Sequence, residues 1–255
     1  MNSVNISKIY IGTSGWSYDE WLGIFYPENF RRSDWLSYYA KHFKTVEINS
    51  SFYNLPKKET FENWARKTPD DFLFAVKASR YITHIKRLID CSEPLDKLFK
   101  AAEGLGKKLG IFLFQLPPNM KFDIERLSNF FKILKDNYAN YTNKTNKLLC
   151  AFEFREESWF CQKTYDLLNE YRYGIVISNS TNFPYHELIT GNFCYIRMHG
   201  SRELYSSSYS EEELKKVADM INKNKVNNIS SYIYFNNDVH GYAVDNAKTL
   251  IRMTS

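Results

Sequence analysis

The chain has 255 residues and a net charge of +5, with 44% hydrophobic, 25% charged and 17% aromatic residues. This length fits one α/β barrel or two small domains, and the composition is that of a soluble globular protein. No stretch approaches the roughly 20 apolar residues that span a bilayer, and the polar N-terminus carries no signal region, so we expect a cytoplasmic protein without a membrane partner.

The net charge and the cysteine spacing exclude further classes of protein. A net charge of +5 mildly favours an anionic partner, either a small ligand or a nucleic acid, but it is far from a basic tail. The four cysteines contain no C-x-x-C pair, which predicts a reducing compartment and no zinc site. The sequence leaves the oligomeric state open.

Eight short apolar runs, rich in β-branched and aromatic residues, are predicted to be strands. In chain order they are Lys8–Ile11, Thr45–Ile48, Phe72–Val76, Gly110–Phe114, Leu149–Phe154, Gly174–Ile177, Phe193–Met198 and Ser231–Phe235.

The stretches between these runs carry helix signals. Ser33, Asp123 and Ser210 are predicted to cap helices, and Glu213 completes a capping box with Ser210. Further helices are predicted around residues 59–67, 95–105, 164–172 and 243–252, whereas Pro184–Leu188 leaves room for barely one turn.

Alternation of strand and helix eight times in about 250 residues predicts a single TIM-like (β/α)8 barrel domain over residues 1–255. An open, doubly wound sheet is the alternative. It would need a glycine-rich phosphate fingerprint after the first strand, and the segment Gly12 to Trp16 lacks one. No P-loop or other nucleotide-cofactor motif is present.

Polar residues cluster at the predicted strand ends. Because side chains alternate along a strand, those out of phase with the helix-facing residues point toward the barrel axis. Seven strands each place polar groups inward at the C-terminal mouth, where TIM barrels carry their active sites. These residues are Glu47, Asn49, Lys77, Gln115, Glu153, Arg155, Asn179, Arg197, His199 and Asn236.

Aromatic side chains follow several of the same strands. Trp16, Tyr53 and Trp159 are expected to line the rim of the mouth, where aromatic faces suit sugars and nucleobases. The alternative to a binding site is a self-satisfied ion network that closes the barrel top, for example through Glu47–Lys77 and Glu153–Arg197 pairs.

Several motifs together resemble the YecE-like family, domain of unknown function 72, from about Ile9 to Leu250. They are Gly12-Thr13-Ser14-Gly15-Trp16-Ser17-Tyr18, Thr45-Val46-Glu47-Ile48-Asn49-Ser50-Ser51-Phe52-Tyr53, Phe114-Gln115-Leu116-Pro117-Pro118, Glu153-Phe154-Arg155 with Ser158-Trp159, Arg197-Met198-His199-Gly200 and Tyr234-Phe235-Asn236-Asn237-Asp238. The resemblance implies a TIM-like barrel and no particular activity. Where the family usually carries an Asp after strand six, this chain has Asn179, and a neutral amide cannot act as a base.

The first functional hypothesis is a hydrolase acting on a phosphorylated or nucleic-acid-type substrate. Arg155 and Arg197 would bind phosphate oxygens, and Glu47, Lys77, Glu153 and His199 would be catalytic. The set Glu47, Glu153 and His199 would also suit a divalent metal ion. Asn237 is included among the substrate-binding residues with the aromatic and amide side chains already named.

Two alternatives stay open. Glu47 and Glu153 would serve a carbohydrate-active hydrolase if they flanked a glycosidic bond. The barrel would also suit binding of an anionic metabolite or nucleic acid without turnover, since no nucleophile motif is present. Replacing Arg197 by Ala distinguishes a binding site from a closed ion network. We expect little loss of stability if Arg197 binds substrate, and a large loss if it holds an ion network together.

Overall fold

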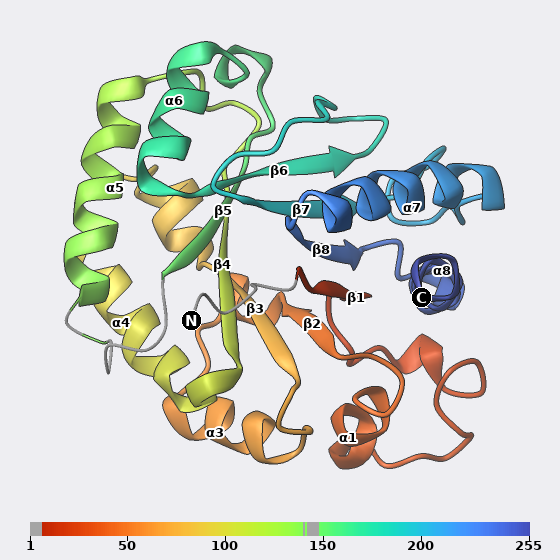
Figure 1. Ribbon diagram of the computed structural model, residues 1–255. Helices are drawn as coiled ribbons and strands as arrows, with labels where there is room; N and C mark the ends of the chain where they lie inside the picture. The colour runs from red at the N-terminus through yellow and green to blue at the C-terminus, as the bar shows by residue number, and fades with distance from the viewer. Residues whose placement is uncertain (1–6, 140, 142–147) are drawn as a thin grey trace, which may run out of the picture.

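The computed structural model describes residues 7–139, 141 and 148–255. Its eight strands are parallel and form one sheet in the order β1-β8-β7-β6-β5-β4-β3-β2, which curls into a nearly closed barrel (Figure 1). The strands are β1 Ile9–Thr13, β2 Thr45–Ile48, β3 Leu73–Lys77, β4 Leu109–Gln115, β5 Leu149–Glu153, β6 Gly174–Asn179, β7 Phe193–Met198 and β8 Ser230–Phe235. The predicted TIM-like fold is confirmed.

The sheet is closed between β1 and β2 by a side chain. Adding a Cβ atom to Gly12 would place it 2.2 Å from the carbonyl oxygen of Thr45, so only glycine lets the two strands approach this closely. The hydroxyl of Tyr39 donates to that carbonyl at 3.1 Å and accepts from the backbone N–H of Thr13 at 2.9 Å. Tyr39 thus bridges two strands between which no backbone ladder is formed in the described residues.

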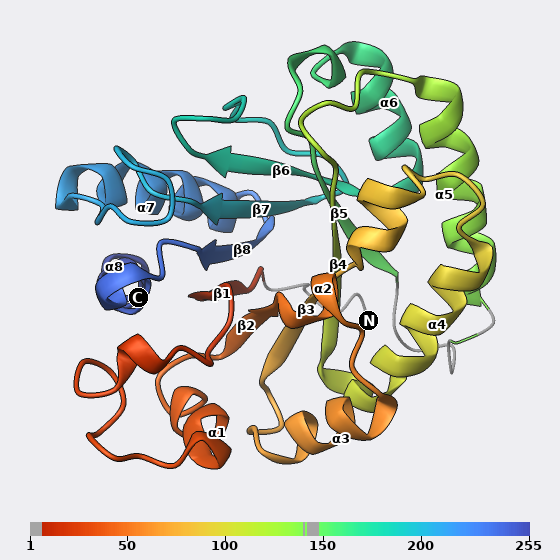
Figure 2. The ribbon, with the colours of Figure 1, turned by 180° about the vertical axis from the view of Figure 1, so that it is seen from behind.

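Helices surround the sheet, with α4, α5 and α6 on one side and α7 and α8 on the other, as the front and back views show (Figures 1 and 2). They are α1 Trp35–Tyr39, α2 Ser50–Tyr53, α3 Lys58–Arg66, α4 Ser92–Ala102, α5 Ile124–Ala139, α6 Gln162–Tyr171, α7 Glu211–Val226 and α8 Tyr242–Thr254. The residues between β6 and β7 are all described and form no helix, in line with the short Pro184–Leu188 stretch.

Two of the three predicted helix caps are confirmed. Asp123 accepts from the backbone N–H of Arg126 at the start of α5, and Ser210 and Glu213 form the predicted capping box of α7. The prediction for Ser33 is wrong, because Ser33 lies within a 3₁₀ turn, Arg32–Asp34, that precedes α1. None of the described helices is long and apolar enough to cross a membrane.

The strands separate two layers of core. The outer layer, between sheet and helices, contains residues such as Val46, Phe152 and Ile196, and the inner layer fills the barrel axis. The inner layer consists of Ala75, Ile111, Leu113, Ala151, Val176, Phe193, Tyr195, Tyr232 and Tyr234. Side chains along each strand alternate between the two layers. The next inward-facing side chains, at the C-terminal end of each strand, therefore point into the mouth of the barrel.

Candidate active site at the C-terminal mouth

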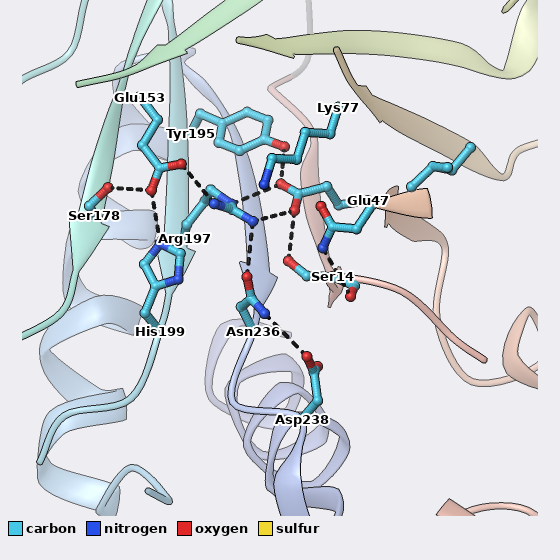
Figure 3. Close-up of polar contacts among 12 residues, drawn as sticks. Ser14, Glu47, Lys77, Glu153, Ser178, Tyr195, Arg197, His199, Asn236 and Asp238 are labelled. Carbon is cyan, nitrogen blue, oxygen red and sulfur yellow. Dashed lines mark hydrogen bonds and ion pairs between the residues drawn. The ribbon is translucent and has the colours of Figure 1, made fainter. Parts of the chain in front are cut away.

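Arg197, near the end of β7, is the centre of a buried polar network inside the mouth (Figure 3). Its Nε and Nη2 atoms donate to the two carboxylate oxygens of Glu47 at 3.1 and 2.8 Å, and Nη1 donates to Oε2 of Glu153 at 2.7 Å. The side chain of Arg197 is 1% exposed and both glutamates are fully buried. One guanidinium group therefore joins β2, β5 and β7 across the barrel.

Hydroxyl groups satisfy the same carboxylates. Glu47 accepts hydrogen bonds from Ser14 and Tyr195, both at 2.7 Å, and Glu153 accepts one from Ser178 at 3.0 Å. A buried carboxylate is tolerated only where donors replace its water, so these hydroxyls are part of what makes two buried anions possible. We call Arg197, Glu47, Glu153 and these three hydroxyl residues the Arg197 network.

The charges in the network keep one another ionised. Burial alone would raise the pKa of Glu47 and Glu153, but neighbouring guanidinium groups outweigh it: Arg197 beside Glu47, and Arg155 and then Arg197 beside Glu153. The pKa of each glutamate therefore lies below its ordinary range. Burial would lower the pKa of Arg197, but the two carboxylates raise it above its ordinary value.

The predicted ion network is thus formed in part. The Glu153–Arg197 pair is present, whereas Glu47 pairs with Arg197 rather than with Lys77. Arg197 was predicted to bind substrate. All three of its guanidinium nitrogens donate within the protein, including Nη2 to Oδ1 of Asn236 at 3.0 Å, so the structure uses Arg197 to hold the mouth together.

His199 follows β7 and is fully buried beside Glu153, with Nε2 at 2.9 Å from Oε1 of the carboxylate. Burial, and then the charge of Arg197, lowers the pKa of His199 to about 4, so the imidazole is neutral at neutral pH. The contact assigns its proton to Nε2, which leaves Nδ1 as an acceptor. Nδ1 is buried and has no hydrogen-bond partner in the described part of the chain. The rings of Phe183 and Tyr205 meet the imidazole edge to face, each at 5.7 Å between centroids.

Lys77, the last residue of β3, lies beside the network without joining it. The side chain points toward Glu47 and Arg197 in Figure 3, yet it makes no ion pair with any residue that the structure describes. Its Nζ atom instead lies 4.1 Å from the centroid of the Phe52 ring. Burial, and then the positive charge of Arg197, lowers the pKa of Lys77 to about 7.

Arg155, two residues beyond the buried Glu153, is the second cation beside the network. Its guanidinium carbon lies 3.9 Å from the centroid of the Phe183 ring, and Nη2 is 3.4 Å from Oε1 of Glu153. The side chain is 11% exposed, and its Nε atom has no partner among the residues described. We call Lys77 and Arg155 the mouth cations, since neither makes the short contacts with both glutamates that neutralise Arg197.

The segments that follow β8 and β1 contribute a third acid, Asp238, and its hydrogen-bond donors. Asn236 donates from Nδ2 to Oδ2 of Asp238 at 3.1 Å, and the Tyr18 hydroxyl donates to the same oxygen at 3.0 Å. Burial raises the pKa of Asp238 to about 7. Two groups of opposite type, Lys77 and Asp238, therefore titrate near neutrality in one mouth.

The predicted amides of β2 and β4 also lie in the mouth. Asn49 donates from Nδ2 to the carbonyl oxygen of Ser14 at 3.2 Å, while its Oδ1 is buried without a partner in the described chain. Gln115 is 4% exposed and lies in register with Glu153. The inward phase predicted for strands two, three, four, five, seven and eight therefore agrees with the structure.

The predicted phase of strand six is wrong. Ile177 packs in the outer core and Ser178 points inward to Glu153, so Asn179, next along the chain, is not in the mouth. Its Oδ1 accepts a hydrogen bond from Tyr209 at 3.0 Å instead. Because β6 is apolar on both faces before Ser178, its alternation did not reveal which face was inner.

The aromatic rim is only partly as predicted. Trp16 is half-buried, with its ring edge-on to Trp64 at 5.1 Å, and Tyr53 is 69% exposed. The prediction for Trp159 is wrong: the side chain is fully buried and its Nε1 donates to the carbonyl oxygen of Met120 at 2.6 Å. Trp159 packs the loops outside the barrel and does not face the mouth.

Asn237 is a structural residue rather than a binding residue. It is fully buried, and its Nδ2 donates to the carbonyl oxygen of Ser207 and to Oδ1 of Asn246, both at 2.9 Å. The side chain thereby ties the loop after β7 to α8, which contradicts its predicted role at the mouth.

The predicted metal ligands do not fit a metal ion. Glu47, Glu153 and His199 are close together, but the guanidinium of Arg197 occupies the space between the two carboxylates. Among the described residues, no group of three or more His, Cys, Asp or Glu side chains is arranged to hold a metal ion. The four cysteines are free thiols.

Sequence reasoning missed four polar residues of the site. Tyr195 stands two residues before Arg197 and so shares its inward face, and Ser14 shares the face of Gly12. Both were detectable from phase alone. Ser178 was hidden by the misassigned strand, and the approach of Asp238 to Tyr18 depends on a loop that no strand phase determines.

The comparisons with known proteins agree with the fold and the motifs. The chain is 27% identical to UPF0759 protein YunF of Bacillus subtilis over an alignment that is 281 positions long and covers 96% of this chain and 94% of that protein. It is 35% identical to UPF0759 protein YecE of Escherichia coli K12 over 111 residues, 43% of this chain and 38% of YecE.

Solved structures match over nearly the whole length. A DUF72 family protein of Thermotoga maritima superposes with a TM-score of 0.83 at 30% identity, covering 96% of this chain and 98% of that one. One from Enterococcus faecalis gives 0.78 at 19% identity, over 96% and 95% of the two chains, and shares the fold. The family model described as "Protein of unknown function DUF72" matches residues 10–255, and the chain belongs to this family.

Proposed function

We propose that this barrel is a hydrolase that acts on a small anionic, phosphate-bearing substrate at its C-terminal mouth. The observation that carries the proposal is the incomplete neutralisation of the mouth cations. Glu47 and Glu153, the two carboxyl groups of the mouth with lowered pKa values, face three basic groups, and Arg197 takes the short contacts with both of them. Arg155 and the ammonium form of Lys77 are left to hold a phosphate group, which both residue types bind well.

The Glu153–His199 pair supports hydrolysis rather than binding alone. A carboxylate that fixes the tautomer of a neutral imidazole leaves the other ring nitrogen free to take a proton from water. Nδ1 of His199 is such a nitrogen, since it is buried without a partner in the described residues. His199 is fully buried and the rings of Phe183 and Tyr205 pack against its imidazole, so these rings would have to move for water and substrate to reach Nδ1.

The second candidate is binding of an anionic metabolite or nucleic acid without turnover. The specific observation in its favour is the pKa of His199, about 4, which makes the imidazole a weak base at neutral pH. The carbohydrate alternative has less support. Glycoside hydrolysis needs one protonated carboxyl group, and both Glu47 and Glu153 have lowered pKa values and bind the same arginine.

Calorimetric titration with inorganic phosphate tests the anion site, and a panel of phosphomonoesters, phosphodiesters and a short single-stranded oligonucleotide tests turnover. Arg155→Met should weaken phosphate binding by about tenfold, the loss of one charge-assisted hydrogen bond. Arg252→Met is the matched control, because it removes an exposed positive charge near the C-terminal end of α8, at the opposite end of the barrel.

Equal binding by the wild-type protein and the Arg155→Met variant would overturn the anion site. Phosphate binding without hydrolysis of any panel member would overturn the hydrolase and leave the binding alternative.

A further inference from the structure

We propose that the amino group of Lys77 is a nucleophile that forms an imine with the carbonyl group of a small anionic aldehyde or ketone. This goes beyond the hydrolase proposal. The hydrolase uses the ammonium form of Lys77 to hold an anion, whereas imine formation uses the neutral amine and makes a covalent bond.

The position of Lys77 provides the geometry. As the last residue of β3 it points inward at the mouth, and it keeps 8% of its surface exposed next to two glutamates that keep none. Its Nζ rests on the face of Phe52, and no ion pair holds it in the described residues because Arg197 has engaged the nearby carboxylates. An amine without a salt bridge is free to turn toward a ligand.

The surroundings of Lys77 favour its neutral form. Burial lowers its pKa most, Arg197 from β7 and Arg155 beyond β5 lower it further, and Glu153 and Glu47 act in the opposite direction. In the turn after β3, burial and then Lys77 lower the pKa of His84 to about 4, so its imidazole adds no charge at neutral pH. Burial and the charged groups together bring the pKa of Lys77 to about 7. A lysine that is desolvated beside another cation is the arrangement that activates amines for Schiff-base chemistry.

The covalent step is balanced without a redox partner. The nitrogen lone pair attacks the carbonyl carbon, so a C–N bond forms as the C=O π bond breaks, and one proton passes from nitrogen to the former carbonyl oxygen. The C–O bond of this carbinolamine then breaks, and the hydroxyl leaves as water with the second proton of the nitrogen, which gives the neutral imine. Arg155 defines the ligand class, because its guanidinium would hold a carboxylate or phosphate on the carbonyl compound.

Reductive trapping of the full-length protein with glyoxylate and cyanoborohydride tests the proposal. Cyanoborohydride delivers hydride to the imine carbon, and the secondary amine that results is located by peptide mass spectrometry. Lys248 is the internal control, since its Nζ also rests on a phenylalanine face, that of Phe25 at 4.8 Å, but on α8 outside the barrel.

At pH 7, Lys77 should be labelled at least ~10-fold faster than Lys248, because each unit of lowered pKa raises the neutral fraction about tenfold. Between pH 6 and 9 the rate at Lys77 should rise and then level off above about 7. Labelling of Lys77 no faster than that of Lys248 would overturn the proposal. Both rates come from one sample of wild-type protein, so no variant has to fold.

An uncharged aldehyde tests the ligand class. The ratio of the labelling rate at Lys77 to that at Lys248 should be larger with glyoxylate than with propionaldehyde, and Arg155→Met should remove that difference. An equal ratio for the two aldehydes in the wild-type protein would refute the anion requirement. Because the readout is a peptide mass, failure of trapping is distinguishable from failure to find hydrolysis.

Discussion

Arg197 and Arg155 have the same side chain, lie at the same mouth and contact the same glutamate, yet their surroundings differ. Arg197 is 1% exposed and makes short hydrogen bonds to Glu47, Glu153 and Asn236. Arg155 is 11% exposed and reaches Glu153 only at 3.4 Å. Its guanidinium group lies over the ring of Phe183.

The comparison shows that the charge of a residue does not tell whether it binds a ligand. A buried cation whose donors are consumed by buried anions maintains the fold, because removing it would leave those anions unpaired. A cation with spare donors at the edge of the same cluster is available to a ligand. Lys77 belongs with Arg155 in this respect, since the described residues offer it no ion pair.

The largest effect should come from Arg197→Met. Loss of the guanidinium leaves Glu47 and Glu153 buried together without a cation between them, which should lower the free energy of unfolding by about 3–5 kcal/mol. Urea denaturation measures this change. This expectation is the opposite of that for a substrate-binding arginine, which should be replaceable with little loss.

Arg155→Met is the comparison for that experiment and should cost less, about 1–2 kcal/mol, because its pair with Glu153 is 3.4 Å long and Arg197 still neutralises Glu153 when Arg155 is removed. If the two variants were equally stable, the distinction between the Arg197 network and the mouth cations would be wrong.

A smaller effect is expected from the pH dependence of Lys77→Met. In the folded protein the pKa of Lys77 is about 7, below the usual value of about 10.4. The unfolded chain therefore binds more protons between these pH values, and Lys77 makes the protein more stable as pH rises through that range. From pH 7 to 9 the wild-type protein should gain about 2 kcal/mol relative to Lys77→Met.

Urea unfolding of both proteins at several pH values measures this difference, and Lys248→Met, which also removes a lysine from a phenylalanine face, is the matched control. Parallel stability curves for the wild-type protein and Lys77→Met would show that the amine titrates normally.

The smallest effects should come from the end of β6. Ser178→Ala and Asn179→Ala each remove one hydrogen bond, to Glu153 and from Tyr209 respectively, and should each cost about 1 kcal/mol. Only Ser178→Ala lies next to the Glu153–His199 pair, so it alone should change activity on any substrate that the panel identifies. An effect of Asn179→Ala on activity as large as that of Ser178→Ala would place Asn179 back at the mouth.

The sequence by itself determined the eight strands, most of the helices and the barrel, because both hydrophobic periods and two of three capping signals are local. It also determined which face of most strands points inward. Glu47, Glu153 and Arg197 could be assigned to one mouth because the apolar residues directly before and after each of them face the helices. His199 continues the phase of Arg197, and Lys77 is in phase with the apolar Ala75.

Only the tertiary structure decided how these charges pair. Whether Glu47 meets Lys77 or Arg197 depends on stagger and side-chain reach across the barrel, over 150 residues of sequence separation, and no local pattern encodes it. The same holds for Trp159 and Asn237, which strand ends and motifs placed at the mouth but loop packing buried elsewhere. Periodicity reports the direction in which a side chain leaves its own strand, while its partner is set by every other strand that closes the barrel.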